Sequence, residues 1–252
     1  MSVVNGWRLF YAVLVCASVL PGWVQAAEIR VAVAANFTLP ATDIAALFED
    51  ETGHTVTLSF GSTGQLYSQI AQGAPFDVVL SADAERAERA VEEGLAIPES
   101  RFTYAIGRLA LYSTDETLVM GLGTVRDADF SRLAIANPVT APYGAATVEV
   151  LEGLGVYGDV EKRIVLGGNL GQVFTFVQSG NAQLGFVALA QIINRPGGSR
   201  FVIPADLHTP IAQDAIVVAA SRQAEVALAF TDFLKSETAR AIIVDYGYDI
   251  SQ

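Results

Sequence analysis

The sequence has very little cysteine, histidine or positive charge. It contains one cysteine, Cys16, and two histidines, His54 and His208, among 252 residues. This scarcity excludes a disulfide framework, and no second histidine lies at metal-ligand spacing from His208. Fifteen Lys and Arg against 27 Asp and Glu give a formal net charge of −12. Because a nucleic-acid binder needs a basic footprint, we expect no nucleic-acid partner.

Long apolar runs are also scarce, and the one that exists lies at the N-terminus. Arg8 precedes an apolar run from Leu9 to Leu20, and Val24-Gln25-Ala26 forms a small-residue cleavage site. These features predict a secretory signal peptide over residues 1–26, which would also remove Cys16. A run of about twelve apolar residues is too short to span a bilayer comfortably. We therefore expect a soluble, exported mature protein; an N-terminal anchor helix or a lipid on Cys16 is the alternative.

Core-forming material is abundant, since 52% of the residues are hydrophobic and 17% are charged. Short apolar runs alternate with segments of helical spacing at intervals of roughly 20 to 30 residues, which indicates βαβ units with mostly parallel sheets. The predicted strands are 29–35, 55–60, 76–81, 104–112, 133–136, 163–166, 184–187, 201–203 and 215–219.

The pattern fits two α/β lobes better than one sheet. We expect one lobe from residues 27–104 and 214–252 and the other from 105–213. The chain would then cross between the lobes near Tyr104 and again near Gln213.

Four junctions between a predicted strand and a predicted helix consist of small or polar residues. They are 35–38, 61–64, 141–144 and 168–171, and none contains Lys, Arg, His, Asp or Glu. A helix start offers unpaired N–H groups and about half a positive charge, and glycine lets a ligand approach the backbone closely. A cation would need carboxylates there. Either the junctions are ordinary caps and turns, or together they seat a fully deprotonated tetrahedral oxyanion.

A catalytic interpretation has weaker support. Ser62 could be a nucleophile, but Gly61-Ser62-Thr63-Gly64 lacks the G-x-S-x-G spacing. Asp83 fits a helix N-cap better than an acid catalyst. We expect a binding protein and no enzyme, with an exported hydrolase that uses Ser62 or His208 as the alternative.

Several segments, in this order along the chain, resemble the periplasmic molybdate-binding proteins of ABC transporters. They include Val33–Phe37, Gly61–Tyr67, Ala141–Gly144 and, as the most specific, Gly73–Asp83. The resemblance implies a type II-like periplasmic-binding-protein fold, in which two lobes with mixed, mostly parallel sheets close at a hinge around molybdate or tungstate. It also implies a periplasmic monomer that delivers the anion to the membrane permease of an ABC importer. No cofactor is implied, and no protein group would bind the molybdenum directly.

In the first lobe, the resemblance places the anion ligands at two junctions. Asn36 stands where many members have serine, so its side-chain amide would replace a hydroxyl donor, and Ala35 beside it can offer only its backbone. Thr63 is the second ligand position, and Ser62 precedes it.

In the second lobe, the resemblance implies backbone donation. The N–H groups of Tyr143 and Leu170 would bind the anion, and Ala188 replaces a tyrosine that supplies a further hydroxyl in some members. A receptor for sulfate or another tetrahedral oxyanion is the alternative, because discrimination between such anions depends on cavity size.

Overall fold

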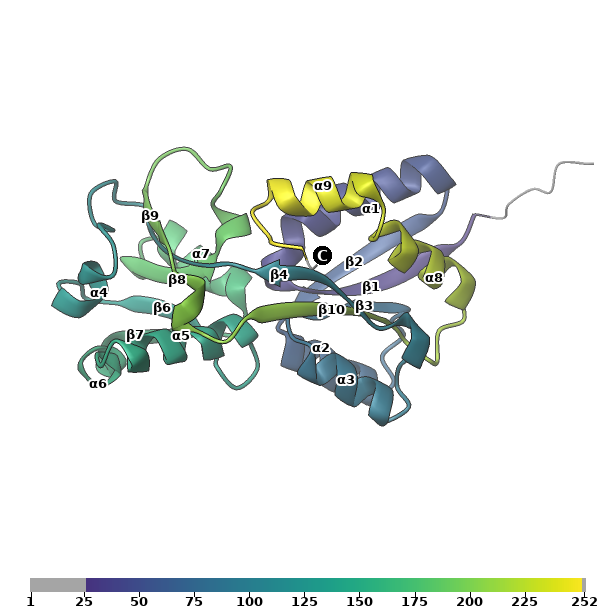
Figure 1. Cartoon of the computed structure of the whole chain (residues 1–252), viewed down its shortest axis with the longest axis horizontal. Helices are drawn as coiled ribbons and strands as arrows, with labels where there is room; N and C mark the ends of the chain where they lie inside the picture. The colour runs from purple at the N-terminus through teal and green to yellow at the C-terminus, as the bar shows by residue number, and fades with distance from the viewer. Residues whose placement is uncertain (1–25, 251–252) are drawn as a thin grey trace, which may run out of the picture.

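A computed structural model describes residues 26–250 and shows two lobes side by side, each with a five-stranded sheet (Figure 1). Apart from Ala26, the expected signal peptide lies outside these residues, as does Cys16. Within residues 26–250, no helix is long and apolar enough to cross a membrane. The expected two-lobed α/β fold is confirmed.

The two sheets have the same plan. In the first lobe the strand order is β2-β1-β3-β10-β4, and in the second it is β7-β6-β8-β5-β9. The first three strands of each order pair in parallel, and the fourth runs antiparallel to both of its neighbours. The first sheet contains β1 (Glu28–Ala34), β2 (Thr55–Gly61), β3 (Val78–Leu80), β4 (Phe102–Gly107) and β10 (Ile211–Val217). The second contains β5 (Leu109–Ser113), β6 (Leu133–Ala136), β7 (Ile164–Gly167), β8 (Leu184–Ala188) and β9 (Ser199–Val202).

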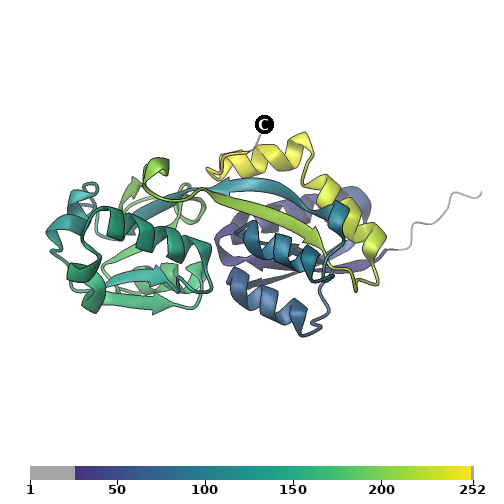
Figure 2. The ribbon, with the colours of Figure 1, turned by 60° about the horizontal axis from the view of Figure 1, so that its bottom comes forward.

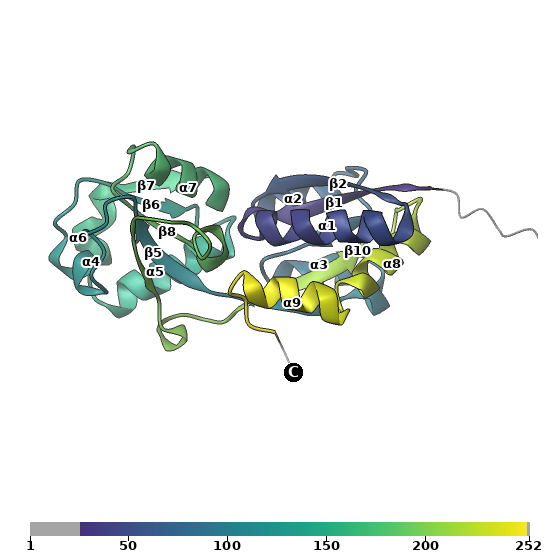
Figure 3. The same cartoon turned by 90° about the horizontal axis from the view of Figure 1, so that it is seen from above.

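Helices cover both faces of each sheet (Figure 3). The first lobe carries α1 (Thr38–Thr52), α2 (Thr63–Ala71), α3 (Glu85–Glu92), α8 (Ala224–Phe233) and α9 (Glu237–Asp245). The second carries α4 (Gly123–Asp127), α5 (Pro142–Gly153), α6 (Tyr157–Val160) and α7 (Leu170–Gln178). Short 3-10 turns are η1 (Ala35–Phe37), η2 (Pro98–Ser100), η3 (Glu161–Arg163), η4 (Leu189–Gln191) and η5 (Ala205–Leu207).

Each face of the first sheet has its own apolar core. On one face, Ile44 and Phe48 of α1 pack with Phe230 of α8 and Ile243 of α9. On the other face, α2 and α3 pack on β1, β3 and β10. In the second lobe, one larger cluster joins the sheet to α5 and α7. Fully buried apolar side chains thus hold each lobe together without a disulfide, as the composition predicts.

The expected strand 104–112 is two strands, because its two halves belong to different sheets. β4 pairs with β10 in the first lobe, and β5 pairs with β8 and β9 in the second. The chain crosses at Arg108, whose carbonyl accepts a hydrogen bond from Leu189 N at 2.9 Å. It returns between β9 and β10, so that β4 and β10 lie side by side as the bridge between the lobes (Figure 2).

Candidate functional site

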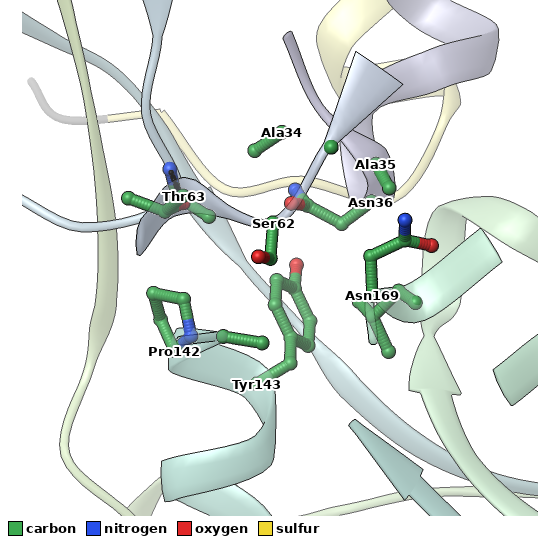
Figure 4. A pocket seen from close by; sticks show the side chains of 12 residues that line it. Ala34, Ala35, Asn36, Ser62, Thr63, Pro142, Tyr143 and Asn169 are labelled. Carbon is green, nitrogen blue, oxygen red and sulfur yellow. Dashed lines mark hydrogen bonds between the residues drawn. The ribbon is translucent and has the colours of Figure 1, made fainter. Parts of the chain in front are cut away.

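A cavity of about 210 Å³, its mouth included, lies between the lobes where all four small or polar junctions meet (Figure 4). It is lined by Ala34, Ala35, Asn36, Gly61, Ser62, Thr63, Ala82, Ala141, Pro142, Tyr143, Asn169 and Leu170. The structure thus brings together every residue that the sequence analysis selected as an anion ligand. The junctions converge because each follows the carboxyl end of a parallel strand, where ligands bind in α/β folds.

The wall of this cavity carries no ionisable side chain apart from the buried phenol of Tyr143. Within residues 26–250, no group of three or more His, Cys, Asp or Glu side chains could hold a metal ion. The cavity therefore offers uncharged hydrogen-bond donors and no cation ligands.

The start of α2 supplies the side-chain donors of the first lobe. Ser62 is 3% exposed, and its Oγ has no hydrogen-bond partner in the protein. Thr63 Oγ1 accepts a hydrogen bond from Ala82 N at 2.9 Å, so its own hydrogen remains available. Gln65 orients the turn, because its Oε1 accepts from Ser62 N at 3.2 Å. A buried hydroxyl without a partner is costly, which indicates that a ligand completes this site.

The structure revises the role expected for Asn36. Its Nδ2 donates to Gln213 Oε1 at 2.8 Å and to Tyr248 OH at 3.1 Å. Because Nδ2 carries two hydrogens, both are committed. The side chain is therefore not available as the amide donor that we expected, and the segment Ala35–Asn36 offers its backbone N–H groups instead. Sequence alone could not show this, because the partners lie 177 and 212 residues away.

The start of α5 presents backbone donors from the second lobe. Pro142 is the first helical residue and has no N–H, so Tyr143 N–H is the first donor of this helix. Gly144 allows α5 to begin against the end of β6, because a Cβ at this position would lie 2.3 Å from Ala136 O. The close approach therefore fixes the position of the Tyr143 amide.

The start of α7 is capped in a way that leaves the Leu170 amide available. Asn169 Oδ1 accepts from Gln172 N at 3.0 Å, and Gln172 Oε1 accepts from Gly168 N at 2.6 Å. Leu170 N–H, as the first helical amide, has no partner within the helix. Asn169 lines the cavity as well, so its side-chain amide is a further candidate donor. The family resemblance pointed to Leu170 and not to Asn169.

A buried polar network lies directly behind the cavity. Gln213 Oε1 accepts from Tyr104 OH at 3.0 Å as well as from Asn36, and Gln213 Nε2 donates to Tyr143 OH at 3.3 Å. Tyr248 OH donates to Asn36 O at 2.8 Å. Burial raises the pKa of all three phenols, so they stay neutral. The sequence position of Tyr248 gave no signal of this contact, because Asn36 lies 212 residues away.

Hydrogen bonds also join the lobes at the rim of the cleft. Gly64 N donates to Thr140 O at 2.9 Å, and Arg86 Nη2 donates to Val139 O at 2.8 Å. Asp83 forms an ion pair with Arg86, and its Oδ1 accepts from Arg86 N at 3.0 Å near the start of α3. The N-cap of α3 is Ala84 and not Asp83, so the expected N-cap role is wrong by one residue, although Asp83 still accepts from an amide of the first turn. The contacts of Gly64 with Thr140 and of Arg86 with Val139 close the lobes upon each other.

The remaining candidates lie outside the cavity wall. His54 Nδ1 accepts from Ala27 N at 3.2 Å, and His208 Nδ1 lies 2.8 Å from Thr209 O. Ala188 is fully buried, and its N–H donates to Gln191 Oε1 at 3.0 Å. None of the three lines the cavity, so no histidine stands beside Ser62 there to act as a base.

The residues that line the cavity place candidate donors for a small tetrahedral dianion on opposite sides of it. Hydroxyl groups come from Ser62 and Thr63, and backbone amides come from the starts of η1, α2, α5 and α7. Each hydrogen bond to a charged group contributes about 1.5–3 kcal/mol. Six such bonds would offset the loss of the anion's hydration and give tight binding without an ion pair.

Comparisons with known proteins show the family of this chain. Residues 29–249 match the family described as bacterial extracellular solute-binding proteins. The molybdate-binding protein ModA of Rhodobacter capsulatus is 51% identical over 223 residues, which are 88% of each chain. ModA of Azotobacter vinelandii is 47% identical over 230 residues, 90% of this chain and 91% of that protein. A solved periplasmic molybdate-binding protein of A. vinelandii superposes with a TM-score of 0.87 at 40% identity, over 89% of this chain and 100% of that one.

Proposed function

This chain belongs to the family of bacterial extracellular solute-binding proteins, and we propose that the solute it captures is molybdate. The observation that carries the proposal is the buried Ser62 hydroxyl, which has no protein partner and lines a cavity of uncharged donors. Relatives that are 51% and 47% identical are named molybdate-binding proteins, which supports the same ligand here.

We assign the ligand role to Ser62, Thr63, Tyr143 and Leu170, with backbone donation from Ala35 and Asn36. Ser62 and Thr63 donate from their hydroxyls, and Tyr143 and Leu170 donate from their backbone N–H groups. Only the closed arrangement lets both lobes reach one anion, so the anion favours closure. The ligand is the intact oxyanion, and its molybdenum contacts no protein group.

The anion would be delivered to the permease of an ABC importer after export to the periplasm, by a receptor that acts as a monomer without a cofactor. The lobes assigned to this movement meet at Arg108 and just before Ile211, a few residues from the expected bounds at 104 and 213, because β4 and β10 belong to the first sheet. Tungstate has the same charge and tetrahedral shape and would fit the same donors. Because donors from both lobes enclose the anion without a catalytic base, the site is suited to retention and release and not to turnover.

Calorimetric titration of the mature protein with molybdate, tungstate, sulfate and phosphate tests the proposal. We expect molybdate and tungstate to bind far more tightly than sulfate, because the metal–oxygen bond is longer and a fixed ring of donors accepts one radius. Phosphate should bind poorly because its proton at neutral pH needs an acceptor. Equal affinities for molybdate and sulfate would contradict the assignment.

A further inference from the structure

The fully buried side chain of Gln213 connects the two anion-binding walls. Its Oε1 holds Asn36, which belongs to the first lobe, at 2.8 Å. Its Nε2 donates to the phenol of Tyr143, which belongs to the second lobe, at 3.3 Å. Both partners lie on segments whose backbone lines the cavity. One side chain thus ties together the donors that must face each other across the anion.

The location of Gln213 suits this role, because it lies on β10, one of the two strands that bridge the lobes (Figure 2). The pairing of β10 with β4 shifts register between Gln213 and Asp214. A bulge of this kind re-aims side chains. The carboxylate of Asp214 accepts from Arg101 Nε at 2.8 Å and from Thr103 Oγ1 at 2.7 Å. Asp214 therefore takes no part in the polar network around Gln213.

The neighbouring strand is shaped to admit the Tyr143 phenol. A Cβ on Gly107, at the end of β4, would lie 2.2 Å from Tyr143 OH and 2.7 Å from Gln213 Nε2. Only glycine leaves room there for the phenol and the amide to meet. The contact is therefore built into the bridge between the lobes and is not an incidental approach of two side chains.

We propose that Gln213 is a positioning residue that fixes the separation of the two donor walls and thereby sets which tetrahedral anion the closed site prefers. The inference rests on the proposed function. Gln213 does not line the cavity, so it acts through Asn36 and Tyr143. A site with fixed spacing discriminates between anions by radius, whereas loosely held walls adapt to either one.

The principal test compares molybdate and sulfate affinities in Gln213→Met. Methionine matches the length of glutamine but makes no strong hydrogen bond. We expect molybdate affinity to fall about tenfold or more while sulfate affinity changes less than about threefold, so that the preference shrinks. Equal losses for both anions, or an unchanged preference, would overturn the inference.

The matched control is Arg101→Met, which removes the partner of Asp214, the neighbour of Gln213 on β10. This variant should melt at a lower temperature but keep the wild-type anion preference, because it leaves the network intact. If it loses the preference as Gln213→Met does, general destabilisation explains the effect and the inference fails.

Gln213→Glu at about pH 5 supplies a rescue, because burial raises the pKa of the introduced carboxyl group and keeps it protonated. The surrounding titratable groups are the neutral phenols of Tyr104, Tyr143 and Tyr248 and the carboxyl of Asp214, which is paired with Arg101 and contributes to the raised pKa of Tyr104. A protonated carboxyl accepts from Asn36 and Tyr104 and donates to Tyr143, so the wild-type preference should return. A folded variant without that preference at this pH would contradict the proposal.

Tyr248→Phe provides a milder variant if Gln213→Met does not fold, because it keeps the ring and frees Asn36 from one partner. It should reduce the preference in the same direction, and an unchanged preference would count against the network. Failure of the wild type to bind molybdate would refute the proposed function itself. A wild type that binds, with variants that keep its preference, would refute only the positioning role.

Discussion

We propose that the two walls of the cavity bind the anion by different means. In this assignment the first lobe adds the hydroxyls of Ser62 and Thr63, at the start of α2, to its backbone donors, whereas the second lobe contributes backbone amides at the starts of α5 and α7. Backbone donors tolerate a change of side chain but depend on the exact position of the helix. Hydroxyl donors tolerate small backbone shifts but are lost with one substitution. The second wall should therefore be sensitive to packing and the first to side-chain chemistry.

The largest expected effect comes from Gly144→Ala in the second wall. The added methyl would lie 2.3 Å from Ala136 O, so the start of α5 must move and carry the Tyr143 amide with it. We expect molybdate affinity, measured by calorimetry, to fall about 100-fold or more, with a lower melting temperature as well.

Gly153→Ala is the matched control, since it lies in the same helix and a Cβ there meets nothing within 4 Å. It should bind as the wild type does. If Gly144→Ala also binds normally, the contact of α5 with the end of β6 does not fix the position of the Tyr143 amide.

In the first wall, we expect Ser62→Ala to lower molybdate affinity without lowering the stability of the protein. Ser62→Ala removes a hydroxyl that has no protein partner, so the melting temperature of the ligand-free protein should not fall. Molybdate affinity should fall by about 1.5–3 kcal/mol, or roughly 10- to 150-fold.

Ser68→Ala, in the same helix but with an exposed side chain, is the control and should change neither quantity. A Ser62→Ala protein with wild-type affinity would show that the Ser62 hydroxyl does not bind the anion.

A pair of substitutions at Leu170 tests backbone donation directly. Leu170→Val keeps the amide and should bind within about threefold of the wild type. Leu170→Pro removes the N–H at a helix start that tolerates proline, and it should lose about tenfold or more in affinity. Melting curves must first establish that the proline variant folds. Normal binding by that variant would exclude the Leu170 amide as a donor.

The smallest expected effect is that of salt on molybdate association, because neither wall of the cavity carries a charged side chain. The chain has a net charge of −12, so it repels a dianion, and added salt screens that repulsion. We expect molybdate association, followed by stopped flow, to become faster by no more than about threefold as salt rises. A steep loss of affinity with salt would reveal a cationic side chain in the site.

The ends of the helices and the location of the candidate site could be predicted from local sequence. Gly53 ends α1 with a φ of 72°, and all four junctions lie at helix or turn starts, because these features depend on neighbouring residues. A crossing was expected near Tyr104, but its place at Arg108 could not be predicted, since only tertiary pairing assigns the two halves of 104–112 to different sheets. The commitment of Asn36 to Gln213 and Tyr248 was equally hidden, because three distant parts of the chain supply one network.

A crystal structure of the mature protein with molybdate, using the anomalous signal of molybdenum, tests the central claim most directly. The account predicts one peak in the cavity, with anion oxygens within hydrogen-bond distance of Ser62 Oγ, Thr63 Oγ1, Tyr143 N and Leu170 N, and with no charged side chain in contact. A peak elsewhere, or an anion held by Arg or Lys, would contradict it.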